Sequence, residues 1–204
     1  PALADIAHVT DARRMVANTV SPLILRPAEL GADIVVHSIT QFISGSSDVI
    51  AGAVCVTEQF IGELMDLHMG PLMLLGPTMD PGIASSVSLL IPHLPVRMAV
   101  HGKRDFELSK RLDELGLKVT YPGLEQHPDH ELFNALRAAE YGYGGVFTLD
   151  VNDAETANDL MSRLQNEQRF GYLAVSLGYF DTVMSCSGSS TSSEMSEDDQ
   201  TSAG

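Results

Sequence analysis

The chain has few basic residues, two cysteines and no tryptophan. Its 204 residues include 12 Lys and Arg against 27 Asp and Glu, which gives a net charge of −15. A field of that sign repels phosphate backbones and anionic lipid, so we expect neither nucleic acid nor a membrane as a partner. No stretch approaches the roughly 18 uninterrupted apolar residues of a membrane helix, and the first residues lack the basic and apolar regions of a signal peptide. We therefore expect a cytoplasmic protein.

The cysteines and histidines do not form a pattern of metal ligands. Cys55 and Cys186 cannot by themselves form a disulfide framework or a four-ligand zinc site. Cys55 lies in an apolar run, which predicts an inert thiol in the core. Residues 125–130 contain two histidines, but Pro128 interrupts the helix that would align them. We therefore expect a solvated loop here and no metal site.

Short apolar runs separated by turns indicate an α/β fold. Hydrophobic residues make up 44% of the chain and charged residues 19%, as in a globular protein. Residues 32–38 and 48–56 are continuous apolar runs, which are typical of strands covered by helices on both faces. Helices are expected over residues 58–69, 80–90 and 97–115, because apolar residues recur on one face and Gly or Pro follows each segment.

A second, smaller unit is expected after Gly116. Its pattern predicts strands over residues 117–121 and 145–151, a helix over 132–139, a helix capped by Asn152, and a closing strand within 170–177. We divide the chain into residues 1–96, a connecting helix over 97–116, a small α/β domain over 117–184, and a tail over 185–204. The tail is rich in serine and then acidic, which predicts disorder.

Several motifs in the same order resemble one enzyme family. The tract over residues 31–52 resembles the region around the cofactor lysine in the trans-sulfuration family of pyridoxal-phosphate-dependent enzymes, which act in Cys and Met metabolism. Similar segments are Asn18-Thr19, 72–79, 121–124, 174–178 and the serine-rich run 185–193. The last of these is typical of plant members of the methionine gamma-lyase branch. The resemblance implies part of a type I aminotransferase-like large domain, followed by a small C-terminal α/β domain, and pyridoxal phosphate as cofactor.

Two departures from the family pattern concern the cofactor itself. Gln41 stands where the family has the lysine that holds the cofactor covalently and moves protons. A primary amide can neither condense with an aldehyde nor act as a base at neutral pH. Ala17 stands where the family has an aspartate that pairs with the pyridine nitrogen and makes the ring an electron sink. The resemblance therefore indicates a truncated, degenerate member with no catalytic residue at the lysine position.

Three hydroxyl residues keep positions that the resemblance assigns to ligands. It places Ser38 and Thr40 in the phosphate cup, beside Gln41 and Ala17, and Ser176 near the substrate carboxylate. At the end of a strand, such residues are polar caps more often than ligands, and the motif around Ser38 and Thr40 raises the case for phosphate contact. His37, at the end of the same run, is expected to be a packed and hydrogen-bonded residue rather than a base.

Two functions from different classes follow. One is a catalytically inactive, methionine gamma-lyase-like protein with a structural or subunit-interaction role. The other is a carbon–sulfur lyase of sulfur amino acids that retains pyridoxal phosphate noncovalently or is completed by a partner chain. A third interpretation is a piece of a longer product. Apolar surface left uncovered on the large domain predicts a homo-oligomer or hetero-oligomer.

Overall fold

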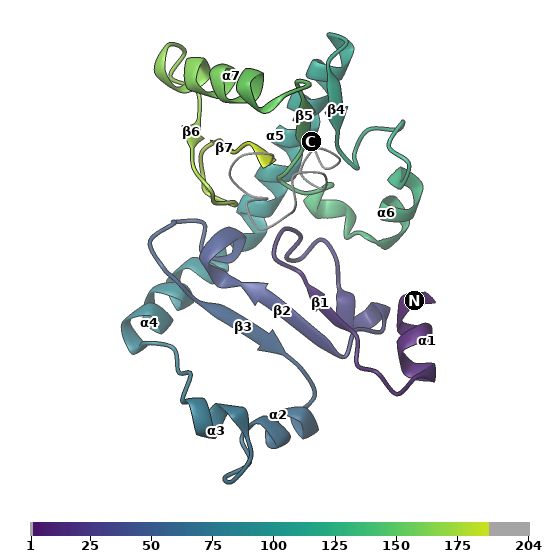
Figure 1. The fold of residues 1–204 in the computed structure, drawn as a ribbon, viewed down its shortest axis with the longest axis vertical. Coiled ribbons are helices and arrows are strands. Elements are labelled where there is room, and N and C mark those ends of the chain that lie inside the picture. The colour runs from purple at the N-terminus through teal and green to yellow at the C-terminus, as the bar shows by residue number, and fades with distance from the viewer. Residues whose placement is uncertain (1, 188–204) are drawn as a thin grey trace.

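A three-stranded sheet forms the first half of the protein (Figure 1). The computed structural model describes residues 2–187. Strand β1 (Met15–Ala17) pairs in parallel with β2 (Ile34–Ser38), and β2 pairs antiparallel with β3 (Gly52–Cys55). The parallel pair requires a crossover, which residues 18–33 supply through a turn and the short 3-10 helix η1 (Pro27–Leu30).

Helices surround this sheet without enclosing it (Figure 1). Helix α1 (Ala2–Val9) lies beside β1, whereas α2 (Glu58–Leu64) and α3 (Pro71–Leu75) lie at the far end of the molecule. Helix α4 (Pro81–Leu90) leads through the short η3 (Ile91–His93) into α5 (Leu94–Glu114), which connects the two halves.

Local sequence accounts for where these helices begin. Thr57 caps α2 by accepting a hydrogen bond from the Phe60 amide at 3.3 Å. Asp80 caps α4 by accepting bonds from Gly82 and Ile83, and Pro81 occupies the first helical position, where its missing N–H has no cost.

The second half of the chain contains two two-stranded sheets and short helices. Strands β4 (Lys118–Thr120) and β5 (Thr148–Asp150) pair antiparallel, and β6 (Tyr172–Leu173) pairs in parallel with β7 (Val183–Met184). The helical elements are α6 (His130–Leu136), η4 (Ala139–Tyr141) and α7 (Ala154–Asn166).

Two clusters of buried side chains hold the first half together. One contains Ile24, Phe42, Leu94 and Met98, and it joins the turn after β1 to α5. The other contains Ile39, Val49 and Val87, and it joins the segment after β2 to α4. The segment that follows β2 therefore packs against both helices.

Several expectations from the sequence were wrong in detail. The helix over 58–69 ends at Leu64, and Pro71 starts a further helix instead of only ending the first, because proline suits a first turn. Asp153, not Asn152, caps α7: Asn152 adopts a positive φ, and the Asp153 carboxylate accepts from the Thr156 amide at 2.7 Å. The closing strand within 170–177 pairs with β7 and not with β4 or β5.

The three-stranded sheet is less buried than the sequence predicted. Only β2 begins with two buried residues, and the described helices leave β1 and β3 largely exposed, so the sheet is not covered on both faces. Cys55 at the end of β3 is exposed rather than part of the core. The tail expected to be disordered lies, from residue 188 onward, outside the described residues.

One helical run is apolar over a long window. Among the described residues, the run Pro81–Glu114 contains an 18-residue window with a mean hydropathy of 1.4, of which 17% is buried. By length and composition alone such a run could cross a membrane, and the core helix of a globular protein passes the same test.

Candidate functional site

The predicted site lies where two parallel strands end. Ala17 is the last residue of β1 and pairs in register with Val36 of β2, two residues before Ser38. The Asn18 amide extends the ladder by donating to the Val36 carbonyl at 2.8 Å. Carboxyl ends of neighbouring parallel strands form the usual ligand-binding edge of an open α/β sheet. The structure therefore brings Ala17 and Ser38 to one edge.

The turn after β1 is fixed by side-chain hydrogen bonds. Asn18 is buried, donates to the Leu25 carbonyl at 3.1 Å, and accepts from the Ser21 hydroxyl at 2.6 Å. The next residue, Thr19, accepts from the Ser38 amide at 3.1 Å. Because these bonds tie the turn to the end of β2, the edge has a defined shape.

Thr40 is held by the backbone of the segment that precedes β3. Its hydroxyl donates to the Ala51 carbonyl at 3.2 Å and accepts from the Ala51 amide at 3.0 Å. Its one hydroxyl proton is thus already used. The hydroxyl therefore links the segment after β2 to the segment that precedes β3.

Gln41 lies in a π-helical turn that no sequence pattern predicted. Residues Ile39–Ile43 form this turn, which is closed by a hydrogen bond of 2.9 Å from the Ser44 amide to the Ile39 carbonyl. Gln41 interrupts it with non-helical angles of φ −94° and ψ −116°. Single π-helical turns are frequent at functional sites. The position expected for the cofactor lysine thus has a distinct backbone conformation.

Arg97 of α5 holds this turn with two hydrogen bonds. Its guanidinium donates to the Phe42 carbonyl at 2.7 Å and to the Ile43 carbonyl at 2.6 Å. Burial lowers the pKa of Arg97, but such a group stays charged, so both are charge-assisted hydrogen bonds. The role of Arg97 could not be predicted from local sequence, because 54 residues separate it from Ile43.

His101 lies one helical turn after Arg97 and contacts the same segment. Its ring packs edge-on against Phe42, with the ring centroids 5.6 Å apart. Burial lowers the pKa of His101, and the positive charges of Arg97 and Arg104 lower it further. The imidazole is therefore neutral near neutral pH.

The segment that carries Ser176 also reaches this turn. Gly178 lies so close to Phe42 that a Cβ at position 178 would be 2.5 Å from the Phe42 backbone nitrogen. Leu177 packs against the buried cluster that contains Phe42. The structure therefore brings the region of Ser176 beside Gln41, although 135 positions separate the two residues.

The hydrogen bonding of His37 differs from the prediction. The Nδ1 atom of His37 is buried and has no hydrogen-bond partner among the described residues, whereas the sequence predicted a hydrogen-bonded ring. His37 pairs in register with Ala53 of β3.

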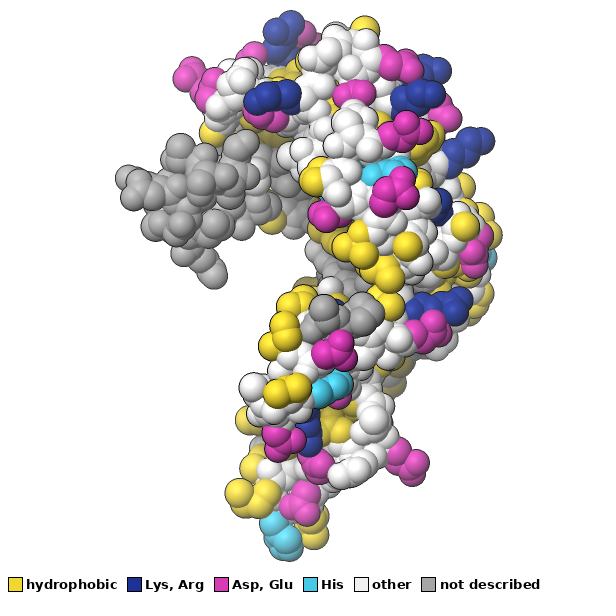
Figure 2. Space-filling model, turned by 90° about the vertical axis from the view of Figure 1, so that its right-hand side faces the viewer, with side chains coloured by type: hydrophobic (Ala, Val, Ile, Leu, Met, Phe, Trp, Pro, Cys, Tyr) yellow, Lys and Arg dark blue, Asp and Glu magenta, His cyan; other side chains and the backbone are white. Residues whose placement is uncertain are grey.

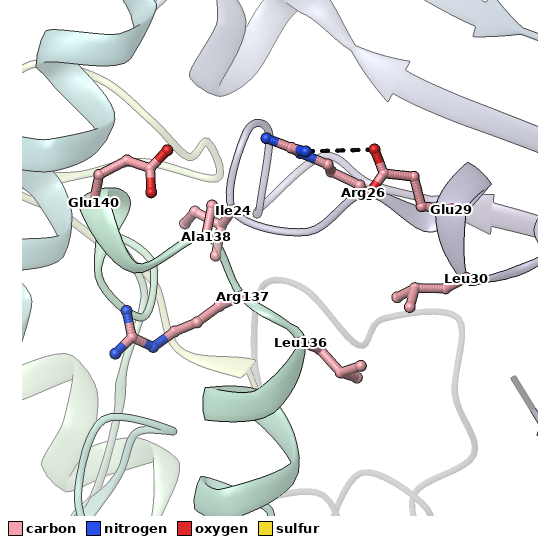
Figure 3. Close-up of a pocket in the computed structure, with 8 residues that line it drawn as sticks. All are labelled: Ile24, Arg26, Glu29, Leu30, Leu136, Arg137, Ala138 and Glu140. Atoms are coloured by element: carbon pink, nitrogen blue, oxygen red, sulfur yellow. Dashed lines mark hydrogen bonds and ion pairs between the residues drawn. The ribbon is translucent and has the colours of Figure 1, made fainter.

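A cavity lies apart from this edge (Figure 3). It has a volume of about 250 Å³ and is lined by Ile24, Arg26, Glu29, Leu30, Leu136, Arg137, Ala138 and Glu140. None of the predicted site residues lines it. Both arginines are engaged, since Arg26 contacts Glu29 at 3.4 Å and Arg137 donates to Asn134 at 2.8 Å. Only the charge of Arg26 is paired with a carboxylate, because the partner of Arg137 is a neutral amide.

Comparison with protein-family models identifies the family of this chain. The model for Cys/Met metabolism PLP-dependent enzymes matches residues 1–204. The chain belongs to this family. The resemblance inferred from the sequence is confirmed, as are the type I fold and the dependence of the family on pyridoxal phosphate.

Known relatives are about twice as long as the chain. Methionine gamma-lyase of Arabidopsis thaliana is 52% identical over 204 residues, which cover the whole chain and 46% of that protein. L-methionine gamma-lyase of Porphyromonas gingivalis is 36% identical over 187 residues, or 90% of the chain and 45% of that protein. The chain is thus a methionine gamma-lyase-like member of the trans-sulfuration enzymes.

A solved structure shows the same fold. Cystathionine gamma synthase from Xanthomonas oryzae pv. oryzae, solved in complex with aminoacrylate and cysteine, superposes with a TM-score of 0.83 at 28% identity. The match covers 99% of this chain and 51% of that one. The chain therefore spans about half the length of the relatives it matches.

Proposed function

We propose that this family member does not carry out covalent pyridoxal-phosphate chemistry and has a structural or subunit-interaction role. One observation carries the proposal: Gln41 occupies the turn after β2, at the edge where the family resemblance expects the cofactor lysine. The carboxamide of Gln41 has no basic lone pair, so it cannot bind the cofactor aldehyde covalently.

The surrounding residues fit the cofactor poorly. Ala17 ends β1 with a methyl group, which cannot pair with a pyridine nitrogen. The Thr40 hydroxyl is already bonded to Ala51, which leaves Ser38 as the simplest donor to a phosphate at this edge. These residues do not fit covalently held pyridoxal phosphate. A proton-transferring group contributes roughly 10²–10⁴ to a rate, so its loss supports an inactive site.

The decisive experiment looks for a bond between cofactor and protein. We expect that the wild-type chain, treated with pyridoxal phosphate and then borohydride, carries no cofactor mass on the peptide that contains position 41. The Gln41→Lys variant is expected to gain that mass there. Gln59→Lys, at an exposed position on α2, is the matched control for nonspecific reaction of a new lysine.

Activity gives an independent test. The wild-type chain is expected to release no α-keto acid from methionine when pyridoxal phosphate is supplied. Release at a rate that scales with the protein concentration would contradict the proposal. It would instead support a lyase that retains the cofactor noncovalently or is completed by a partner chain.

A further inference from the structure

Helix α5 places Arg97 and His101 against the turn that contains Gln41. The two residues are one helical turn apart, so they lie on the same face of α5. The Arg97 guanidinium donates to the carbonyls of Phe42 and Ile43. The His101 ring packs edge-on against the Phe42 ring, with the centroids 5.6 Å apart. Phe42 is fully buried, so both contacts hold a fixed part of the turn.

Two glycines let the backbone approach these side chains closely. A Cβ at position 145 would be 2.9 Å from the His101 Cβ and 3.0 Å from the Phe42 ring. A Cβ at position 45 would overlap the Arg97 guanidinium. His101 is therefore packed against two segments of the chain besides its own helix, and neither Phe42 nor Gly145 brings a charge to it.

The positive charges around His101 come from its own helix. Residues 27–96 contain no Lys or Arg, and most of the Lys and Arg side chains visible in Figure 2 lie toward the end of the molecule that carries α7 and β4. Burial lowers the pKa of His101, and the charges of Arg97 and Arg104 lower it further. A proton on the His101 ring therefore adds a positive charge to a site that already faces two.

Other titratable groups near this contact differ from His101 in the sign of their effect or can be removed separately. Asp105 lies one turn after His101 on α5, and burial raises its pKa to about 6. Tyr141 of η4 packs against the buried cluster that contains Phe42, and His37 of β2 precedes the turn. A raised carboxyl pKa stabilises the fold as pH falls, whereas a lowered histidine pKa destabilises it. Loss of order on acidification is therefore the effect expected of His101 and not of Asp105.

We propose that Arg97 and His101 form a pH-sensitive clamp on the turn over residues 39–43. While His101 is neutral, its ring stays against Phe42 and the turn is closed. When the ring takes up a proton, it leaves the apolar contact and the neighbouring guanidinium for solvent, which releases the turn. Acid thus opens the edge at Gln41. The clamp works in the chain without cofactor, so it goes beyond the function proposed above and does not depend on it.

Hydrogen exchange on the whole 204-residue chain measures the clamp. The Ser44 and Gly45 amides close the turn by donating to the Ile39 and Gln41 carbonyls, each at 2.9 Å. Their protection factors are exchange rates corrected for the intrinsic effect of pH. We expect these factors to fall by roughly tenfold from pH 7 to pH 5, since one proton taken up on opening changes the equilibrium by about ten per pH unit at most. Amides inside α7 should keep their protection.

Three histidine variants assign the effect. His101→Phe keeps a ring beside Phe42 but takes up no proton, so protection of the turn should be the same at pH 7 and pH 5. His101→Gln is a second variant without a titrating ring and should behave alike. His93→Gln, at an exposed position on η3, is the matched control and should keep the pH dependence of the wild type. Circular dichroism checks that each variant is folded.

The wild-type chain provides a check that needs no variant. The pH at which the turn loses protection should match the midpoint of the His101 ring titration measured by NMR, and a mismatch would overturn the inference. Equal protection at pH 7 and pH 5 would also overturn it. So would a fall that persists in both His101 variants and disappears in His37→Gln, which would assign the proton to His37. An equal fall at the amides of α7 would mean that the whole fold loosens and that no clamp acts on the turn.

Discussion

At the scale of single residues, burial decides the charge of Asp105. This carboxyl group lies on α5 beside Tyr121, and burial raises its pKa to about 6. Burial, and after it the nearby Asp105, also raises the pKa of Tyr121, whose hydroxyl donates to the Gly144 carbonyl at 2.9 Å. Burial therefore makes ionisation of both groups harder, although Asp105 with a pKa of about 6 is still ionised at neutral pH.

The raised pKa of Asp105 predicts a pH dependence of stability. The folded carboxyl holds its proton more tightly than the unfolded one, so its ionisation lowers stability as pH rises from about 4 to about 6. Asp105→Asn should raise the free energy of unfolding by about 2 kcal/mol at neutral pH and change it little near pH 4. Urea unfolding at both pH values measures this.

The exposed Glu107 on the same helix provides the control for Asp105. Glu107→Gln also removes one negative charge, but that charge is exposed to solvent and not buried. An equal gain from both substitutions would show that net charge, and not burial of Asp105, causes the effect.

Gly178 shows how one missing side chain shapes the site. Its φ is +78°, and an added Cβ would be 2.5 Å from the Phe42 backbone. Gly178→Ala should lower the free energy of unfolding by about 3 kcal/mol, from both backbone strain and the clash. Gly116→Ala is the matched control, because Gly116 has a φ of +82° with open space around its Cβ position. Equal losses would contradict the steric explanation.

At the scale of elements, α7 depends on its cap. The Asp153 carboxylate accepts from the Thr156 amide and from the Thr156 hydroxyl at 2.9 Å, and these hydrogen bonds lower the pKa of Asp153. Asp153→Ala leaves that amide unpaired and should lower the thermal midpoint by about 2–4 °C.

Asp159→Ala provides the comparison within α7. It removes the same charge from an exposed position inside the helix, where alanine is the better helix former. We expect its thermal midpoint to stay near that of the wild type. A similar fall in both variants would argue against a capping role for Asp153.

At the scale of the whole molecule, Arg97 links α5 to the turn after β2. Arg97→Met should lower the free energy of unfolding by about 2–4 kcal/mol, because two carbonyl groups lose charge-assisted hydrogen bonds. Hydrogen exchange at the Ser44 and Gly45 amides, which close the turn, should become faster.

Two variants test whether the guanidinium fork matters. Arg97→Lys should not restore stability, since one ammonium group cannot reproduce the planar pair of donors. Arg104→Met, at an exposed position on the same helix, should leave exchange at Ser44 and Gly45 unchanged. Full rescue by lysine would mean that charge alone holds the turn.

Short-range patterns explain how much of the fold could be predicted. Helix α4 and strand β2 appear close to their predicted bounds, because capping residues and β-branched runs act within a few positions. Helix α3 and the π-helical turn were missed, since proline is ambiguous between stop and start and no local composition specifies a π-helical turn.

The sequence by itself determined the family, the fold class, and the chemistry available at positions 17 and 41, since a side chain carries its functional group wherever it is placed. Only the tertiary structure decided that Arg97 holds the turn at Gln41, that Gly178 approaches Phe42, and that neither α2 nor α3 has a buried residue. Those properties depend on contacts and burial between segments far apart in the chain, which local residue patterns do not encode.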